Sequence, residues 1–305
     1  MSGSAPTPAS RLAVAVALGL VYVVWGSTYL AIRFAVETIP PFLMSGARFL
    51  LSGAILYALA RWRGVPKPAP RDWATSAVVG FCLLLCGNGG VGYAEKYLDS
   101  GLTALLVATV PLWMMLGGWL AGMTPRPGWP AWVALAAGFA GVVLIARPPA
   151  PSLHELTPHR GAAIGLVLFA ALVWAAGSLY AKQSRPAASP FLLAGMQMLC
   201  GGLFLSLAGI GEWHGFSLAQ VGARAAWALV YLTFVGSLVG FTAYIWVLRA
   251  APPALVGTYA FVNPLVALLL GWLWGAERLT PPVLGGALLV VAAVAVLLVT
   301  APKKA

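Results

Sequence analysis

Apolar runs long enough to cross a membrane follow one another along the whole chain, and they leave room only for short connections. A membrane-spanning helix needs about 20 consecutive apolar residues. The runs cover residues 12–33, 42–60, 73–94, 102–122, 129–146, 161–181, 190–209, 225–247, 254–275 and 281–300. The sequence therefore predicts an all-α membrane protein with ten transmembrane helices.

The composition excludes a water-soluble globular domain. Of the 305 residues, 61% are hydrophobic and 8% are charged, whereas soluble domains carry about 25% charged residues. The formal net charge of +11 does not indicate nucleic acid, because basic residues of membrane proteins collect in cytoplasmic loops. No loop interleaves aromatic and basic residues in the manner of nucleic-acid-binding modules. We expect the lipid bilayer as the surrounding partner, no nucleic acid, and a monomer or homodimer.

The distribution of basic residues predicts the orientation. With the N-terminus inside, 11 of the 18 Lys and Arg residues lie on the cytoplasmic side, six on the outer side and Arg48 within a span. Most of this bias comes from the cluster between Arg61 and Arg71. The positive-inside rule then places both termini in the cytoplasm.

The two halves of the chain repeat one another. A glycine-rich helix end followed by a proline-interrupted helix occurs twice, and without gaps Gly87 matches Gly240 and Pro111 matches Pro264. Each half contains five spans, an odd number, so the second half is expected to be inverted. Inverted repeats place the substrate site near the membrane midplane, between the halves. Further matches pair Tyr93 with Trp246, Lys96 with Arg249, Trp25 with Trp174, Gly46 with Gly195, and Gly53 with Gly202.

Several motifs in order resemble the EamA repeats of the drug/metabolite transporter superfamily, with the closest likeness to its YedA-like exporter branch. They are Trp25-Gly-Ser-Thr-Tyr29, Ala47-Arg48-Phe49, Gly87-Asn-Gly, Ala94-Glu95, Val107-Ala-Thr-Val-Pro-Leu112 and Tyr259-Ala-Phe-Val-Asn-Pro264. The resemblance implies two inverted five-helix repeats in the cell (inner) membrane, both termini cytoplasmic, and export of small metabolites such as amino acids. One departure is Gly275-Ala-Glu277 in the second half, where the first half has Gly122-Met-Thr124.

The resemblance also divides the chain. The expected parts are a cytoplasmic tail at 1–11, a first repeat at 12–147, a linking loop at 148–160, a second repeat at 161–300 and a tail at 301–305.

Pro111 and Pro264 fall near the centres of their spans and are candidate hinges or gates. A mid-helix proline lacks an N–H and pushes away the carbonyl four residues earlier, here that of Val107 or Ala260. Lipid offers these carbonyls no hydrogen bond, so protein or cavity water must supply one. The alternative is a static kink that only fits the packing.

Arg48 lies inside a span, where a charge requires a partner or an aqueous cavity. It could hold a substrate carboxylate at two points, as guanidinium groups do. Alternatively it is a structural clamp that reaches outward to Glu95 or Glu37. Its match in the second half is the neutral Gln197, which could offer a polar contact near the opposite face.

Three further polar residues are candidates. Glu95, at the outer end of a span, could couple transport to protons, as membrane carboxylates do, or it could be an interfacial partner of Lys96 or Arg48. Asn88 lies two turns deeper. Asn263, beside Pro264, could contact the substrate or satisfy the freed backbone.

Aromatic rings are the expected walls of the substrate site, since they suit an amphipathic ligand and can hold cations. The alternative is the interfacial belt in which Trp and Tyr collect. The candidates are Trp25, Tyr29, Tyr93, Trp113, Trp174 and Tyr259.

Enzymatic chemistry is not expected. Gly87-Asn-Gly-Gly-Val-Gly92 matches the GxGxxG pattern, but a dinucleotide site needs a preceding strand in a soluble unit. The three Cys and three His residues have no metal-ligand spacing. We therefore expect no cofactor, no metal, and a secondary transporter working by alternating access. A proton-coupled multidrug or cation exporter and a passive facilitator are the alternatives.

Overall fold

The structure is a computed structural model that describes residues 10–94, 97–98, 103, 106–146, 159–184, 186, 188–274 and 281–300. These residues form helices and connecting turns, without a strand among them. In the first half the helices are α1 (Arg11–Ala35), α2 (Pro41–Trp62), α3 (Pro70–Gly80), η1 (Phe81–Gly89), α4 (Gly90–Ala94), α6 (Val110–Leu120) and α7 (Trp129–Ala146). In the second half they are α8 (Arg160–Gln183), α9 (Pro190–Ala208), η3 (Ile210–Trp213), η4 (Leu218–Gln220), α10 (Ala223–Tyr231), η5 (Leu232–Phe241), α11 (Thr242–Ala250), α12 (Pro253–Gly257), α13 (Tyr259–Trp274) and α14 (Pro281–Thr300).

Each predicted span overlaps helices of the described residues, although part of 102–109 lies outside them, so the all-helical class is confirmed. Six of the described helical segments are long and apolar enough to cross a membrane by length and composition: 11–32, 41–62, 70–94, 160–183, 190–208 and 223–250. Four shorter apolar helices fall at 110–120, 129–144, 253–266 and 284–297. The protein is therefore a multi-pass membrane protein.

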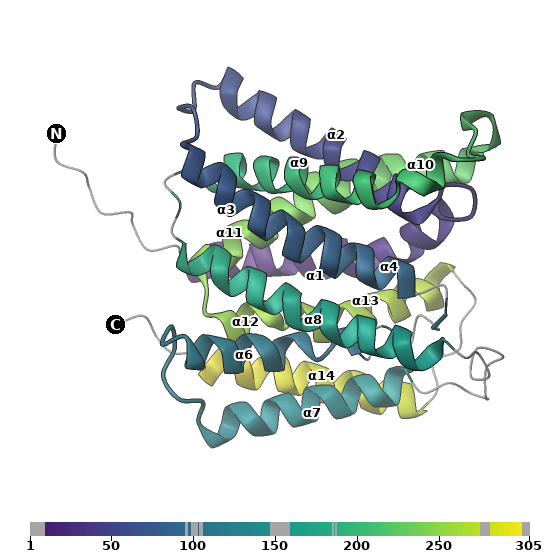
Figure 1. Ribbon diagram of the computed structural model, residues 1–305. Coiled ribbons are helices and arrows are strands. Elements are labelled where there is room, and N and C mark those ends of the chain that lie inside the picture. The colour runs from purple at the N-terminus through teal and green to yellow at the C-terminus, as the bar shows by residue number, and fades with distance from the viewer. Residues whose placement is uncertain are drawn as a thin grey trace, which may run out of the picture.

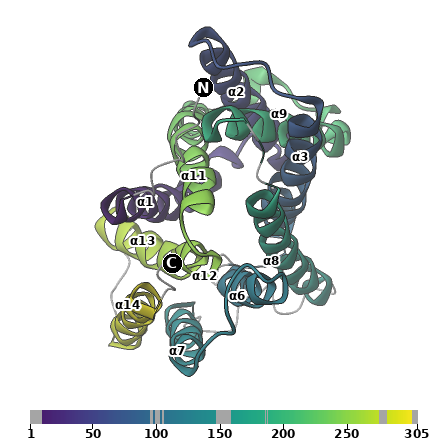
Figure 2. The same ribbon diagram turned by 90° about the vertical axis from the view of Figure 1, so that its left-hand side faces the viewer.

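The helices form one bundle in which several elements of the first half pack against elements of the second. Figure 1 shows them running side by side, with α1 beginning and α14 ending at the same end of the bundle. Figure 2, which looks along the helices, places α2 with α9 at one side and α7 with α14 at the other. Between these two pairs, α1, α8, α11, α12 and α13 surround the middle of the molecule. Both lateral pairs join a helix of the first half to its match in the second.

Glycines allow α2 and α9 to approach closely. A Cβ added at Gly53 would lie 2.7 Å from the Leu199 nitrogen and 2.8 Å from the Gly195 carbonyl oxygen. A Cβ at Gly202 would lie 2.7 Å from the Leu50 nitrogen. Small residues permit such backbone contact between membrane helices. The glycines that match one another in the repeat alignment thus join the two halves.

One feature that the sequence did not predict is π-helical geometry at matching positions of the two halves. It covers η1 in the helix over 70–94 and η5 in the helix over 223–250. The spacing that aligns Gly87 with Gly240 brings η1 onto 234–242, which overlaps η5. π-Helical turns are rare and occur frequently at functional sites, since they displace backbone carbonyls from their usual partners.

The two matched prolines have different surroundings. Pro111 lies in the first turn of α6, directly after the break at residues 108–109. There its missing N–H is not needed and its fixed φ suits a helix start. In the second half the break comes at Thr258, six residues before Pro264, which sits inside α13. Equivalence in sequence therefore does not give equivalent helix breaks.

A central substrate cavity between the two halves

A cavity of about 390 Å³ lies between the halves. Small-molecule sites have volumes of about 300–1,000 Å³, so this cavity suits a small metabolite. Both halves line it, with side chains or backbone of Trp25, Thr28, Ile32, Val36, Pro41, Phe42, Met44, Ser45, Arg48, Phe49, Leu84, Gly87, Asn88, Gly89, Val91, Gly92, Val107, Val110, Ala170, Ala171, Trp174, Gly236, Phe241, Tyr259 and Asn263. The lining extends from the middle of α1 to the connection between α1 and α2.

Two matched tryptophans meet at the deep end of the cavity. The rings of Trp25 and Trp174 contact edge to face, with centroids 5.7 Å apart. Each ring packs on a glycine of the other half. A Cβ at Gly240 would lie 2.7 Å from Trp25 Nε1, and a Cβ at Gly87 would lie 2.5 Å from Trp174 Cε3. The missing side chains of these glycines are therefore what admits the tryptophan rings.

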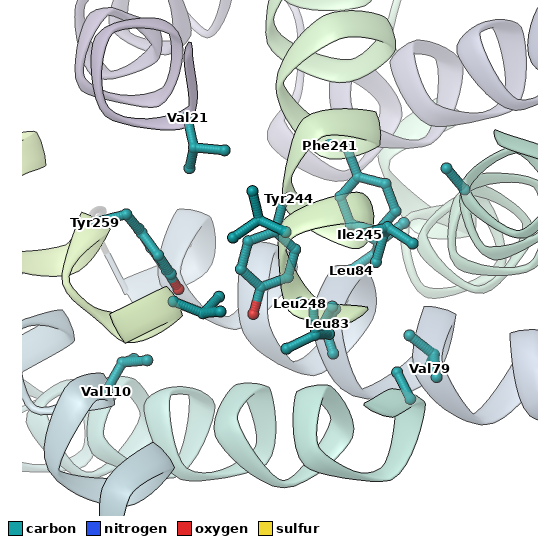
Figure 3. Close-up of a cluster of buried hydrophobic side chains, with 14 of the residues drawn as sticks. Val21, Val79, Leu83, Leu84, Val110, Phe241, Tyr244, Ile245, Leu248 and Tyr259 are labelled. Atoms are coloured by element: carbon teal, nitrogen blue, oxygen red, sulfur yellow. The ribbon is translucent and has the colours of Figure 1, made fainter. Parts of the chain in front are cut away.

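Tyr244 completes this aromatic cluster, and it was not among the predicted site residues. It is fully buried, with its ring centroid 4.9 Å from that of Trp25 and 5.6 Å from that of Tyr259. Figure 3 shows Tyr244 and Tyr259 close together in the apolar cluster. The Tyr244 hydroxyl accepts a hydrogen bond from Trp174 Nε1 at 3.0 Å and shares another with Ser178 Oγ at 2.6 Å. The repeat alignment pairs Tyr244 with Val91, so it gave no signal for this residue.

The π-helical segment η5 accepts hydrogen bonds from the other half. Trp25 Nε1 donates to the Gly236 carbonyl at 3.2 Å, and Ser52 Oγ donates to the Thr233 carbonyl at 2.9 Å. Backbone carbonyls inside a membrane must be satisfied within the protein. The contacts with α1 and α2 therefore stabilise the displaced backbone of η5 beside the cavity.

Arg48 contacts the same segment. Its Nε donates to Ser237 Oγ at 2.6 Å, and its guanidinium carbon lies 4.6 Å from the Phe49 ring centroid. The side chain is only 3% exposed, and Nη1 is buried without a hydrogen-bond partner among the described residues. Glu37 is one of the two residues expected to pair with Arg48, but its Oε1 lies 3.7 Å from Arg224 Nη1 instead. The structure thus holds Arg48 at the cavity by a neutral hydroxyl.

The described carboxylates are engaged with other groups. Asp72 accepts from the Ala69 nitrogen at the start of α3. Glu212 accepts from the Phe42 and Leu43 nitrogens at 2.9 and 3.0 Å, where it satisfies free N–H groups at the start of α2. With Glu37 beside Arg224, no acid side chain is among the described residues that line the cavity.

The other predicted residues divide between the cavity and elsewhere. Trp25, Arg48, Asn88, Trp174, Tyr259 and Asn263 line the cavity. Gln197 is buried but outside the lining, while Trp113 donates to Thr109 Oγ1 at 3.3 Å. Tyr93 is 39% exposed and stacks with Phe42 at 6.2 Å between centroids. Glu95 and the Tyr29 side chain lie outside the described part of the chain.

Beyond the tryptophans, the end of the bundle where α1 begins is closed by packed apolar side chains and by hydrogen bonds to backbone carbonyls. Val21, Leu83 and Leu248 belong to one buried cluster (Figure 3). Lys182 Nζ donates to the Leu248 and Ala251 carbonyls at 2.7 and 2.6 Å, which fastens α8 to the end of α11. Arg249 donates to the carbonyls of Pro186 and Ala188 at 3.0 and 3.2 Å. The cavity is therefore closed at this end.

A helical bundle with a ligand-sized cavity between its two halves is the arrangement found in membrane transporters built from internal repeats. Residues 12–147 and 161–299 each match the model of the EamA-like transporter family. The chain belongs to this family, within the drug/metabolite transporter superfamily.

Curated relatives agree with this assignment. The inner membrane transporter YedA of Escherichia coli K12 is 38% identical over 267 residues, covering 87% of this chain and 83% of its own. The transporter YoaV of Bacillus subtilis is 24% identical, covering 91% of this chain and 94% of its own. A probable terminal-alkyne amino-acid exporter of Streptantibioticus cattleyicolor is 26% identical and covers 89% of both chains.

The fold also occurs in a solved crystal structure with a TM-score of 0.78 and 18% sequence identity. The match covers 96% of this chain and 98% of that one. At this identity the likeness shows the common fold alone.

Proposed function

We propose that the protein is a secondary transporter that exports small metabolites, such as amino acids or related amphipathic compounds, by alternating access. The observation that carries this proposal is a cavity walled by matched elements of both repeats and closed at one end. In alternating access, one repeat moves against the other around a fixed midplane site. The contacts of Trp25 with Trp174 and Gly240 lie at that boundary.

The proposal includes ten spans in two inverted five-helix repeats, with both termini in the cytoplasm. In this orientation the closed end, marked by Lys182 and Arg249, faces the cytoplasm, and the lining at Val36 and Pro41 faces outward. Pro111 and Pro264 lie on helices beside the cavity, where they remain candidate hinges.

Amino-acid export is favoured by the Streptantibioticus cattleyicolor relative, a probable terminal-alkyne amino-acid exporter. The transporter relatives also favour transport over catalysis. A proton-coupled multidrug exporter would need an acid at the site, for which Glu95 is the candidate. A passive facilitator needs no coupling residue.

Counterflow in proteoliposomes tests the proposal. Vesicles are preloaded with single unlabelled amino acids, and uptake of the labelled compound is followed with and without a pH gradient. Saturable, preload-dependent accumulation is the expected result. Uptake that is linear in concentration and independent of the preload would replace the carrier with a passive facilitator.

The variant Glu95→Gln tests whether Glu95 couples transport to protons. If Glu95 couples transport to protons, this variant loses gradient-driven uptake and keeps exchange. Unchanged driven uptake would remove Glu95 from the mechanism.

A further inference from the structure

We propose that the cavity binds organic anions, and that Arg48 pairs with the carboxylate of an amphipathic ligand while the Trp25–Trp174 aromatic cluster contacts its apolar body. This inference rests on the proposed transport function and names the substrate class of the same site. It makes cationic drugs poor ligands.

The first step of the argument is the charge of the site. Among the described lining residues, Arg48 is the one residue with a formal charge. Asp72, Glu212 and Glu37 are occupied with other groups. A buried cation inside a membrane is unfavourable without a counter-charge, so an anionic ligand is bound more favourably here than a cationic one.

The second step is the hydrogen-bonding state of the guanidinium. Its Nε is used by Ser237, which fixes the plane of the group, whereas Nη1 has no partner among the described residues. A guanidinium can bind a carboxylate through two parallel N–H donors. The Nη1 side therefore remains for a ligand oxygen, without loss of the contact that holds the side chain.

The third step is the rest of the lining. Phe49, Trp25 and Trp174 supply apolar surface, and Asn88 and Asn263 supply amide groups. The Asn263 Oδ1 is buried without a partner among the described residues, and as an acceptor it suits an N–H or O–H group of the ligand rather than its carboxylate. A compact ligand with a carboxylate at one end and an apolar body at the other matches this division.

Equilibrium binding to the purified full-length protein in detergent tests the inference. Three probes share one apolar body: 3-phenylpropionate, 3-phenylpropionamide and 3-phenylpropylamine. Affinities are taken from the ligand-dependent rise in melting temperature. We expect the acid to bind at least about tenfold more tightly than the amide, because a charge-assisted pair is stronger than a neutral hydrogen bond, and the amine to bind weakest.

The Arg48→Gln variant should lose the preference for the acid, and Arg48→Lys should retain part of it. Arg224→Gln is the matched control, since Arg224 lies near Glu37 away from the cavity, and it should keep the full preference. If Arg48→Gln does not fold, Ser237→Ala removes only the hydroxyl that fixes Arg48, and it should weaken binding of the acid more than binding of the amide.

Equal affinity of the wild-type protein for acid, amide and amine would overturn the inference, as would failure of the acid to bind folded protein. An Arg48→Gln variant that keeps the preference would also overturn it. Binding of the acid without counterflow of any compound would instead contradict the proposed transport function and leave the anion site intact. If the same counterflow assay is run with the three probes, counterflow of 3-phenylpropylamine alone would contradict the anion site and support the proposed transport function.

Discussion

Trp25 of the first repeat and Trp174 of the second meet edge to face, with ring centroids 5.7 Å apart, although 149 positions separate them in the chain. They match in the repeat alignment, so their contact joins equivalent positions of the two halves. The equivalence does not extend to their hydrogen bonds. Trp25 Nε1 donates to a backbone carbonyl of η5, while Trp174 Nε1 donates to the Tyr244 hydroxyl. The two sides of the cavity therefore have different chemistry.

The glycines under the two tryptophans should not tolerate a side chain. Gly240→Ala places a methyl group 2.7 Å from Trp25 Nε1, and Gly87→Ala places one 2.5 Å from Trp174 Cε3. We expect each to lower the free energy of unfolding by about 1–3 kcal/mol through overpacking, seen as a lower melting temperature in detergent. Gly165→Ala, which has nothing within 4 Å of the added Cβ, is the control and should not destabilise.

The hydroxyl of Ser52 should stabilise the π-helical segment of the other repeat. Its single O–H is shared between the Arg48 carbonyl in its own helix and the Thr233 carbonyl of η5, at 2.7 and 2.9 Å. We expect Ser52→Ala to cost about 0.6 kcal/mol and at most about 1.7 kcal/mol, the average and maximum for hydrogen bonds between membrane helices. Ser206→Ala is the control, because Ser206 Oγ donates only to the Gly202 carbonyl of its own helix. Equal melting temperatures for the two variants would contradict the role given to Ser52.

Tyr244→Phe should destabilise the aromatic cluster without changing its shape. Loss of the hydroxyl removes the acceptor of Trp174 Nε1 and the partner of Ser178. A buried group left without a partner costs about 1–3 kcal/mol, measurable in the same melting experiment. Tyr180→Phe, at a position of α8 that is 41% exposed, should have little effect.

The hydrogen bonds of Lys182 should keep the bundle closed at the end where α1 begins. Because Lys182 Nζ holds the Leu248 and Ala251 carbonyls, Lys182→Met should raise the population that opens at this end. The measurement is the labelling rate of a cysteine at Val21, after the native cysteines are replaced, by a water-soluble thiol reagent. We expect faster labelling in Lys182→Met and a smaller change in Lys182→Arg. The control is Lys67→Met, in the loop between α2 and α3 at the same end of the bundle. An unchanged labelling rate in Lys182→Met would contradict the role given to the hydrogen bonds of Lys182.

Much of the architecture could be read from local patterns. The helix over 41–62 and that over 190–208 are apolar runs that begin at a proline, and both were predicted within two residues. The alignment of Gly53 with Gly202 indicated a repeat, and the structure brings these two glycines to the same interface. The π-helical geometry of η1 and η5 was not predicted, since no residue type in 81–89 or 232–241 specifies it.

What the sequence by itself determined is the membrane class, the positions of the helices, the internal repeat and the family. These depend on hydrophobicity and spacing along the chain. The tertiary structure decided that Arg48 meets Ser237, that Glu37 lies beside Arg224, and that the ring of Tyr244 packs against that of Trp25. Such contacts depend on the rotation and register of helices far apart in sequence, and in an almost uniformly apolar chain many of these arrangements bury similar surface. Close packing and the need to satisfy each buried polar group select among them.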